Sequence, residues 1–209
     1  MENMELWNKV CKTNPNEAKP VTISKRNITT IDAQFQRKRA TEVFGPYGIG
    51  WGVVPESERF EFKEMEGTTL VSYFSILFYC LGDKQGKIPI NASIKMAYKT
   101  NKGEGYLLID DEYTKKVQTN AITKGLSTLG FNSDVFEGKF DDDKYIQQMK
   151  QEFYFVNEDQ IETINNLINE KKADVIRFLK FMNAKSVRHI LRDDYPKALA
   201  ALKKKVKND

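Results

Sequence analysis

Hydrophobic residues follow two different periods along this chain. Between residues 51 and 100 they alternate with polar residues or run almost unbroken, which is the pattern of β-strands. Over residues 31–44, residues 113–129 and most of the chain after residue 156, they recur every three or four positions, as on one side of a helix. The pattern therefore predicts an α+β protein.

Three strands are predicted in the first pattern, over residues 51–63, 68–81 and 88–100. The second is apolar on both faces, as expected in the middle of a sheet. Pro55 in the first strand indicates an irregularity or a sheet edge. Because the strands follow one another through short turns, an antiparallel meander is favoured. A further short strand is expected at residues 21–23.

One helix is predicted before these strands in the sequence and another after them. One covers residues 31–44, with Thr30 as its N-cap and a Gly-Pro pair as its stop. The longer helix begins at Asp110 or Asp111 and runs to about Leu129, with Gly130 as its stop.

The last third of the chain has a mainly helical pattern. An acidic run at residues 141–143 caps a helix over residues 144–152, and Asn157 and Ser186 are N-caps of later helices. A final helix starts at Tyr195. The predicted domains are an N-terminal arm over residues 1–20, a core over residues 21–155 and a small α-helical domain over residues 156–209.

Charge is distributed unevenly over the 209 residues. The net charge is +4, from 33 Lys and Arg against 29 Asp and Glu. Residues 19–39 hold six basic residues and one acidic residue, residues 56–66 hold five acidic and two basic residues, and residues 84–102 hold no acidic residue. Such segregation indicates a cationic track on the surface. Chance patches on a solvated surface are the alternative.

Few residues suit catalysis. His189 is the only histidine, and Cys11 and Cys80 lie far apart, so we expect neither a zinc site of ordinary spacing nor a nucleophile–histidine pair. The glycine-containing loop at residues 82–88 is too short for a phosphate-binding loop and lacks its Ser or Thr. The sequence predicts a protein that is not an enzyme and uses no metal or cofactor.

Two acidic groups leave a metal-dependent nuclease as an alternative. Residues 110–112 and 141–143 each carry three carboxylates, enough to hold a divalent cation. Their positions at predicted helix starts suit N-caps better.

No segment of the sequence suits a membrane. The longest apolar run, over residues 70–81, is shorter than the roughly 20 residues of a membrane span. The N-terminus has no apolar signal region. With two distant cysteines interpreted as reduced thiols, we predict a cytoplasmic protein without membrane contact.

Cations and aromatic rings gather between residues 23 and 51. Single-stranded nucleic acid attracts cations to its phosphates and stacks its unpaired bases on ring faces. Because Arg37, Lys38 and Arg39 are consecutive, they fan over about 200° of a helix and cannot all face one ligand. We predict Lys38 and Arg39 as contacts, while Arg37 suits a solvated or subunit-pairing role equally well. Tyr47 and Trp51 are candidate base-stacking residues, with core or turn packing as the alternative.

Two blocks carry a family signature. The first is residues 39–45 (RATEVFG), preceded by residues 23–26 (ISKR) and followed by Gly50-Trp51. The second is residues 113–131 (YTKKVQTNAITKGLSTLGF), followed by Asp-Val-Phe at 134–136. Together they resemble phage single-strand annealing proteins of the superfamily formed by Sak, Erf and the eukaryotic Rad fifty-two recombination mediators. The resemblance covers about residues 21–143.

This resemblance implies an antiparallel sheet packed on the long helix, with subunits side by side in a ring or filament. It also implies DNA in a basic groove and annealing that needs no ATP. Arg26 matches a DNA-contacting arginine of the family, and Lys124 matches a basic position of the long helix. Thr123 and Ser127 stand where eukaryotic members carry basic residues, and Asn120 replaces a usual Asp, so other cations are expected to compensate. The predicted DNA-binding residues are Lys25, Arg26, Lys38, Arg39, Lys115, Lys116 and Lys124.

The predicted function is that of a phage recombination protein that anneals complementary single strands in the host cytoplasm. Its predicted partners are single-stranded DNA, further copies of itself, and a host or phage single-strand binding protein or nuclease held by the C-terminal domain. A protein that coats single-stranded DNA without annealing it is the first alternative. The nuclease and an architectural oligomer that binds no nucleic acid are the others.

Overall fold

The computed structural model describes residues 3–23, 26–100 and 105–204, which form two compact units. The first unit comprises Met1–Thr13 and Glu17–Gly138, and the second comprises Asn14–Asn16 and Lys139–Asp209. The sequence placed the division after residue 155. It falls earlier because the end of α5 (Asp143–Tyr154) bonds to the second unit: Gln151 donates to the Arg188 carbonyl at 3.0 Å.

The first unit is built on an antiparallel five-stranded sheet. Its two long strands, β5 (Thr68–Leu81) and β6 (Lys84–Lys99), pair along their whole length through a tight turn. Strands β3 (Trp51–Val53) and β4 (Arg59–Met65) pair in succession with the other side of β5, and β7 (Leu107–Ile109) pairs with the end of β6. The predicted α+β class with antiparallel pairing is confirmed.

The first predicted strand is broken in two. A 3-10 turn over Pro55–Ser57 separates β3 from β4, and both strands still pair with β5. Proline has no backbone N–H and a fixed φ, so it interrupts a strand at the irregularity that the sequence indicated. Strand β7 was not predicted, because three apolar residues carry too short a pattern.

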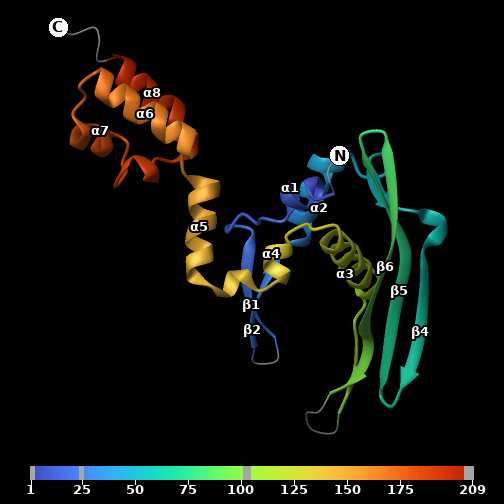
Figure 1. Cartoon of the computed structure of the whole chain (residues 1–209). Helices are drawn as coiled ribbons and strands as arrows, with labels where there is room; N and C mark the ends of the chain where they lie inside the picture. The colour runs from blue at the N-terminus through green and yellow to red at the C-terminus, as the bar shows by residue number, and fades with distance from the viewer. Residues whose placement is uncertain (1–2, 24–25, 101–104, 205–209) are drawn as a thin grey trace. The chain divides into compact units, whose positions relative to one another are not determined.

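The long helix α3 (Tyr113–Thr128) packs on one face of β5 and β6 (Figure 1). At Gly125 the helix lies so close to the sheet that a Cβ atom there would be 2.5 Å from Cγ2 of Ile90. Val117, Ala121 and Leu126 of the same helix are buried against the sheet. This apolar stripe holds the helix on the sheet, and its polar side chains are half-buried or exposed.

Residues 5–13 do not form the loosely attached arm that the sequence predicted. Helix α1 (Glu5–Val10) buries Val10 in the core of the first unit. Beyond it, Thr13 donates to the Asp134 carboxylate through its backbone N–H at 2.7 Å and its hydroxyl at 2.6 Å. Asp134 belongs to the short helix α4 (Ser133–Phe136), so buried polar contacts tie this segment to the fold.

A hairpin leads into the second helix of the unit. Strands β1 (Ala18–Ile23) and β2 (Arg26–Ile31) pair antiparallel, which places Thr30 opposite Lys19 inside the hairpin. The predicted N-cap at Thr30 is therefore wrong. Helix α2 (Ala33–Phe44) is capped instead by Asp32, whose Oδ1 accepts from the Gln34 N–H at 2.8 Å.

The second unit is helical, as predicted. Asp142 caps α5, and Asn157 forms a complete capping box with Gln160 at the start of the next helix. Ser186 precedes only a 3-10 turn over Val187–His189, and no helix follows it there. The other helices of the unit are α6 (Glu158–Glu170), α7 (Val175–Phe181) and α8 (Tyr195–Lys204). Within the described ranges, no helix combines the length and apolar character needed to cross a membrane.

Candidate nucleic-acid interface

Helix α2 presents a polar side because its apolar residues are spaced for burial. Gln36, Ala40 and Phe44 recur at four-residue intervals and are buried. Gln34, Lys38 and Thr41 follow the same rhythm on another side and are exposed. The hydrogen bond from the Gln34 N–H, assisted by the Lys19 ammonium, lowers the pKa of the Asp32 carboxyl that starts the helix.

The turn after α2 fixes the position of Tyr47. The N–H of Gly50 donates to the Pro46 carbonyl at 2.8 Å, and the Gly48 N–H donates to the Trp51 carbonyl at 2.7 Å. Gly50 packs so closely on α2 that a Cβ there would lie 1.8 Å from the Phe44 carbonyl oxygen. Only glycine fits this approach, and the tight turn holds Tyr47 beside β3.

The sequence named Trp51 and Tyr47 both as candidate stacking residues, and the structure buries one of them and exposes the other. Trp51 is fully buried, and its Nε1 donates to Thr41 Oγ1 at 3.2 Å. Tyr47 is 53% exposed and meets Trp51 edge to face, with ring centroids 5.0 Å apart. The prediction of Trp51 as a base-stacking residue is therefore wrong, because neither face of its ring reaches solvent, whereas Tyr47 remains available.

These side chains surround an open depression of about 470 Å³, which we call the α2–α3 depression. Two cations, an exposed ring and several hydrogen-bonding groups line it. Its residues are Gln34, Arg37, Lys38, Thr41, Tyr47, Trp51, Gln118 and Ile122.

Arg37, and not Arg39, shares the depression with Lys38. Arg39 turns away, pairs with Glu42 at 2.8 Å and donates to the Lys9 carbonyl at 3.2 Å. The prediction that Arg39 accompanies Lys38 is therefore not supported by its position: its guanidinium is engaged on the α1 side of α2. The spacing of Gln34, Lys38 and Thr41 at i, i+4 and i+7 would have pointed to this side of the helix.

A second open hollow of about 450 Å³, the Lys116 hollow, lies along α3. It is lined by Ile94, Asp110, Glu112, Lys115, Lys116, Thr119 and Asn120. Arg37 Nη2 lies 3.5 Å from Thr119 Oγ1, so its side chain reaches from the depression to the edge of this hollow. The two hollows and Arg37 together form one polar track across α2 and α3.

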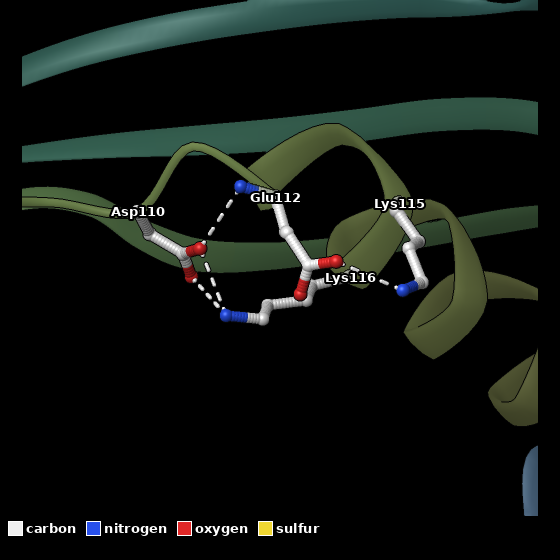
Figure 2. Close-up of polar contacts among 4 residues, drawn as sticks. All are labelled: Asp110, Glu112, Lys115 and Lys116. Atoms are coloured by element: carbon white, nitrogen blue, oxygen red, sulfur yellow. Dashed lines mark hydrogen bonds and ion pairs between the residues drawn. The ribbon is translucent and has the colours of Figure 1, made fainter.

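Carboxylates engage both lysines of the Lys116 hollow. Lys116 Nζ lies 2.8 Å from both carboxylate oxygens of Asp110, and Lys115 Nζ lies 2.9 Å from Glu112 Oε1 (Figure 2). The hydrogen bond from Lys116 lowers the pKa of Asp110 and raises that of Lys116, and the bond from Lys115 lowers the pKa of Glu112. The positive charge predicted for this part of α3 is thus balanced by its own neighbours.

The remaining predicted cations do not join the track. Lys124 is exposed, but it lies two residues beyond Ile122 and so about 200° around the helix from the depression. Lys25 lies outside the described residues. Arg26 opens β2, but its side chain is also outside the described part.

The acidic groups considered for a nuclease have other partners. Asp110 and Glu112 take the two lysines, and the Asp142 side chain accepts from the Lys144 N–H at 2.8 Å. Among the described residues, no three metal-binding side chains gather in one place.

No protein-family model matches the chain, and the search of curated proteins found no match. The resemblance to single-strand annealing proteins therefore stays a prediction from the two sequence blocks.

Proposed function

We propose that the chain binds single-stranded DNA along the track and, as a homo-oligomer, pairs complementary strands without ATP or a cofactor. In this proposal it is a recombination protein of the single-strand annealing type, acting in the cytoplasm of a phage host. It breaks no bond, and its work is to hold strands with their bases accessible.

One observation carries the proposal: Arg37, Lys38 and the exposed ring of Tyr47 line a single open depression. Two adjacent cations match the phosphates of one strand, and a ring face half in solvent suits an unpaired base. Gln34 and Gln118 add hydrogen-bonding groups at the same place. Such contacts hold the backbone and read little sequence, which annealing of any complementary pair requires.

The small number of cations favours an assembly over a single subunit. Since Lys115 and Lys116 are already paired, the track offers two cations without an ion pair among the described side chains, Arg37 and Lys38. Two phosphate contacts give weak binding, but several linked copies on one strand multiply it through effective concentration. Phosphate-dominated binding also predicts a strong dependence on salt.

Two assays test the proposal on the full chain. Fluorescence anisotropy of a labelled oligonucleotide should show binding that weakens steeply with salt, and mixing complementary oligonucleotides should show faster duplex formation with protein than without it. A protein that only coats strands would bind but slow duplex formation. No binding at low salt would refute the proposal altogether.

The second unit is proposed to recruit a protein partner such as a single-strand binding protein or a nuclease. Ile176 and Phe181 of α7 are largely exposed, and Lys197 Nζ lies 5.3 Å from the Phe181 ring centroid. An apolar surface with a cation beside it suits an acidic, apolar segment of a partner. Full-length chain and its Ile176→Asp variant, compared by calorimetry with purified host single-strand binding protein, would test this: heat with both or with neither contradicts it.

A further inference from the structure

Strands β3, β4 and β7 of the five-stranded sheet each pair with a single strand among the described residues, and β4 and β7 lie at the same end of the sheet. Strand β4 pairs only with β5, and β7 only with β6, among the described residues; Figure 1 shows β4 as the outermost strand beside β5. Both carry exposed apolar side chains, with Phe62 54% and Ile109 66% exposed. Unpaired edges with apolar side chains are templates for pairing with another chain.

The directions of β4 and β7 and their positions along the sheet allow the two strands to pair between copies. Each strand in the series β4, β5, β6 and β7 is antiparallel to the next, so β4 and β7 run in opposite directions. Met65, Thr68, Tyr98 and Leu108 form one row of successive Cα partners across the sheet. A second copy displaced sideways therefore brings its β7 alongside β4 of the first, antiparallel and at the same end of the sheet.

Charge separates this arrangement from pairing between like edges. The β4 side, residues 55–66, holds five glutamates against Arg59 and Lys63, a net charge of −3. Near β7, strand β6 carries Lys95 and Lys99 and no acidic residue. Of the three carboxylates just beyond β7, at residues 110–112, the first and third are paired with lysines of α3. Two β4 edges would repel each other, as would two β6–β7 edges, whereas unlike edges attract.

We infer that copies of this chain join head to tail by antiparallel pairing of β4 on one copy with β7 on the next, which continues the sheet from copy to copy. A contact between two different surfaces does not close after two copies; repeated, it produces a ring or a filament. The inference rests on the assembly required by the proposed function and specifies the surfaces that build it.

The exposed apolar side chains of the two edge strands lie on the same face of the sheet, as the pairing requires. Phe62 and Ile109 both lie on the α3 face of the sheet, because their rows pass through Val71 and Ala97, which are buried there. If one copy then shifts along the strand direction by two residues relative to the other, each side chain stays on its face of the sheet. This shift brings Ile109 of one copy opposite Phe62 of the next, so the two exposed apolar side chains cover each other.

Directional cross-linking tests the interface. In a background with Cys11 and Cys80 replaced by Ser, Met65→Cys and Leu108→Cys are made singly and together. The two positions of one chain are three strand spacings apart, about 14 Å, whereas between copies the two-residue slip leaves them about 8 Å apart. A bis-maleimide with a reach of about 8–12 Å therefore joins them only between copies. The double variant should give a ladder of products, a mixture of the two single variants should give dimers, and each single variant alone should give none.

Two results would overturn the inference: cross-linked dimers from one single variant alone, which indicate pairing of like edges, or no product from the double variant. Sedimentation of Ile109→Lys gives a second reading and should show monomers where the parent assembles. Ile76→Lys is the control, because Ile76 is the same residue type and is also exposed, at 37%, but lies on a strand inside the sheet. Assembly that survives Ile109→Lys contradicts the interface.

The DNA site can fail separately from this interface. Cross-linking and sedimentation are done without DNA, so their failure leaves the α2–α3 depression untouched. Conversely, a protein that assembles but does not bind oligonucleotides would contradict DNA binding in the α2–α3 depression and would leave the β4–β7 pairing intact.

Discussion

Replacement of Lys38 by Gln offers the sharpest test of the α2–α3 depression. Lys38 is exposed on α2, lines the depression and makes no ion pair with any described residue. Its ammonium is therefore available to a phosphate without first breaking another contact. Glutamine keeps most of the side-chain length and the helix propensity but removes the charge, so the helix itself should be unaffected.

The size of the effect follows from counterion release. For single strands each phosphate contact contributes about 0.7 to the slope of log affinity against log salt, so a rise from 50 to 200 mM salt costs about 2.6-fold per contact. Lys38→Gln should therefore lower the slope by about 0.7 for each protomer on the oligonucleotide. Anisotropy titrations on one labelled oligonucleotide at four salt concentrations measure it directly.

Lys115→Gln is the matched control for this measurement. It removes the same charge from an exposed helix position, but from a lysine that Glu112 already engages at 2.9 Å. Its slope should stay closer to that of the parent. If Lys115→Gln flattened the salt dependence while Lys38→Gln left it unchanged, the path of the strand inferred here would be wrong.

Three further substitutions test neighbouring features. Asp110→Asn should release Lys116 and steepen the salt slope by about 0.7 per protomer; an unchanged slope in the same titration would show that no phosphate reaches this hollow. Tyr47→Ala should cost about 1–3 kcal/mol of oligonucleotide binding through lost stacking while Tyr47→Phe retains it, and equal affinities of the two variants would remove stacking from the account. Gly50→Ala should destabilise the first unit by about 1–3 kcal/mol in urea unfolding, because its Cβ would overlap the Phe44 carbonyl; a parent-like midpoint would contradict the tight turn.

Elements with long, regular patterns were predictable from the sequence. Strand β5 matches the predicted residues 68–81, and α3 lies within the predicted long helix. The Asn157 cap was also readable, because a capping box is a contact between residues three apart. In each case the signal is local, so no knowledge of the rest of the fold was needed.

Short strands, and the start of helix α2, could not be predicted from the sequence alone. The sequence predicted Thr30 as the N-cap of α2, but Thr30 pairs with Lys19 in the hairpin, and Asp32 caps the helix instead. Strand β7 exists because the end of β6 gives it a partner. Both outcomes depend on a neighbouring strand and not on local propensity.

The candidate site shows the same division. By itself the sequence determined the inventory: consecutive cations at 37–39, a glycine turn that presents an aromatic ring, and lysines on a long helix. Only the tertiary structure decided their roles. It buried Trp51, drew Arg39 to Glu42, balanced Lys116 with Asp110, and placed Arg37 between the two hollows. A sequence fixes which charges a chain carries, but whether a charge faces a ligand or a carboxylate depends on which elements pack together, because electrostatic contacts act over a few ångströms in space and not along the chain.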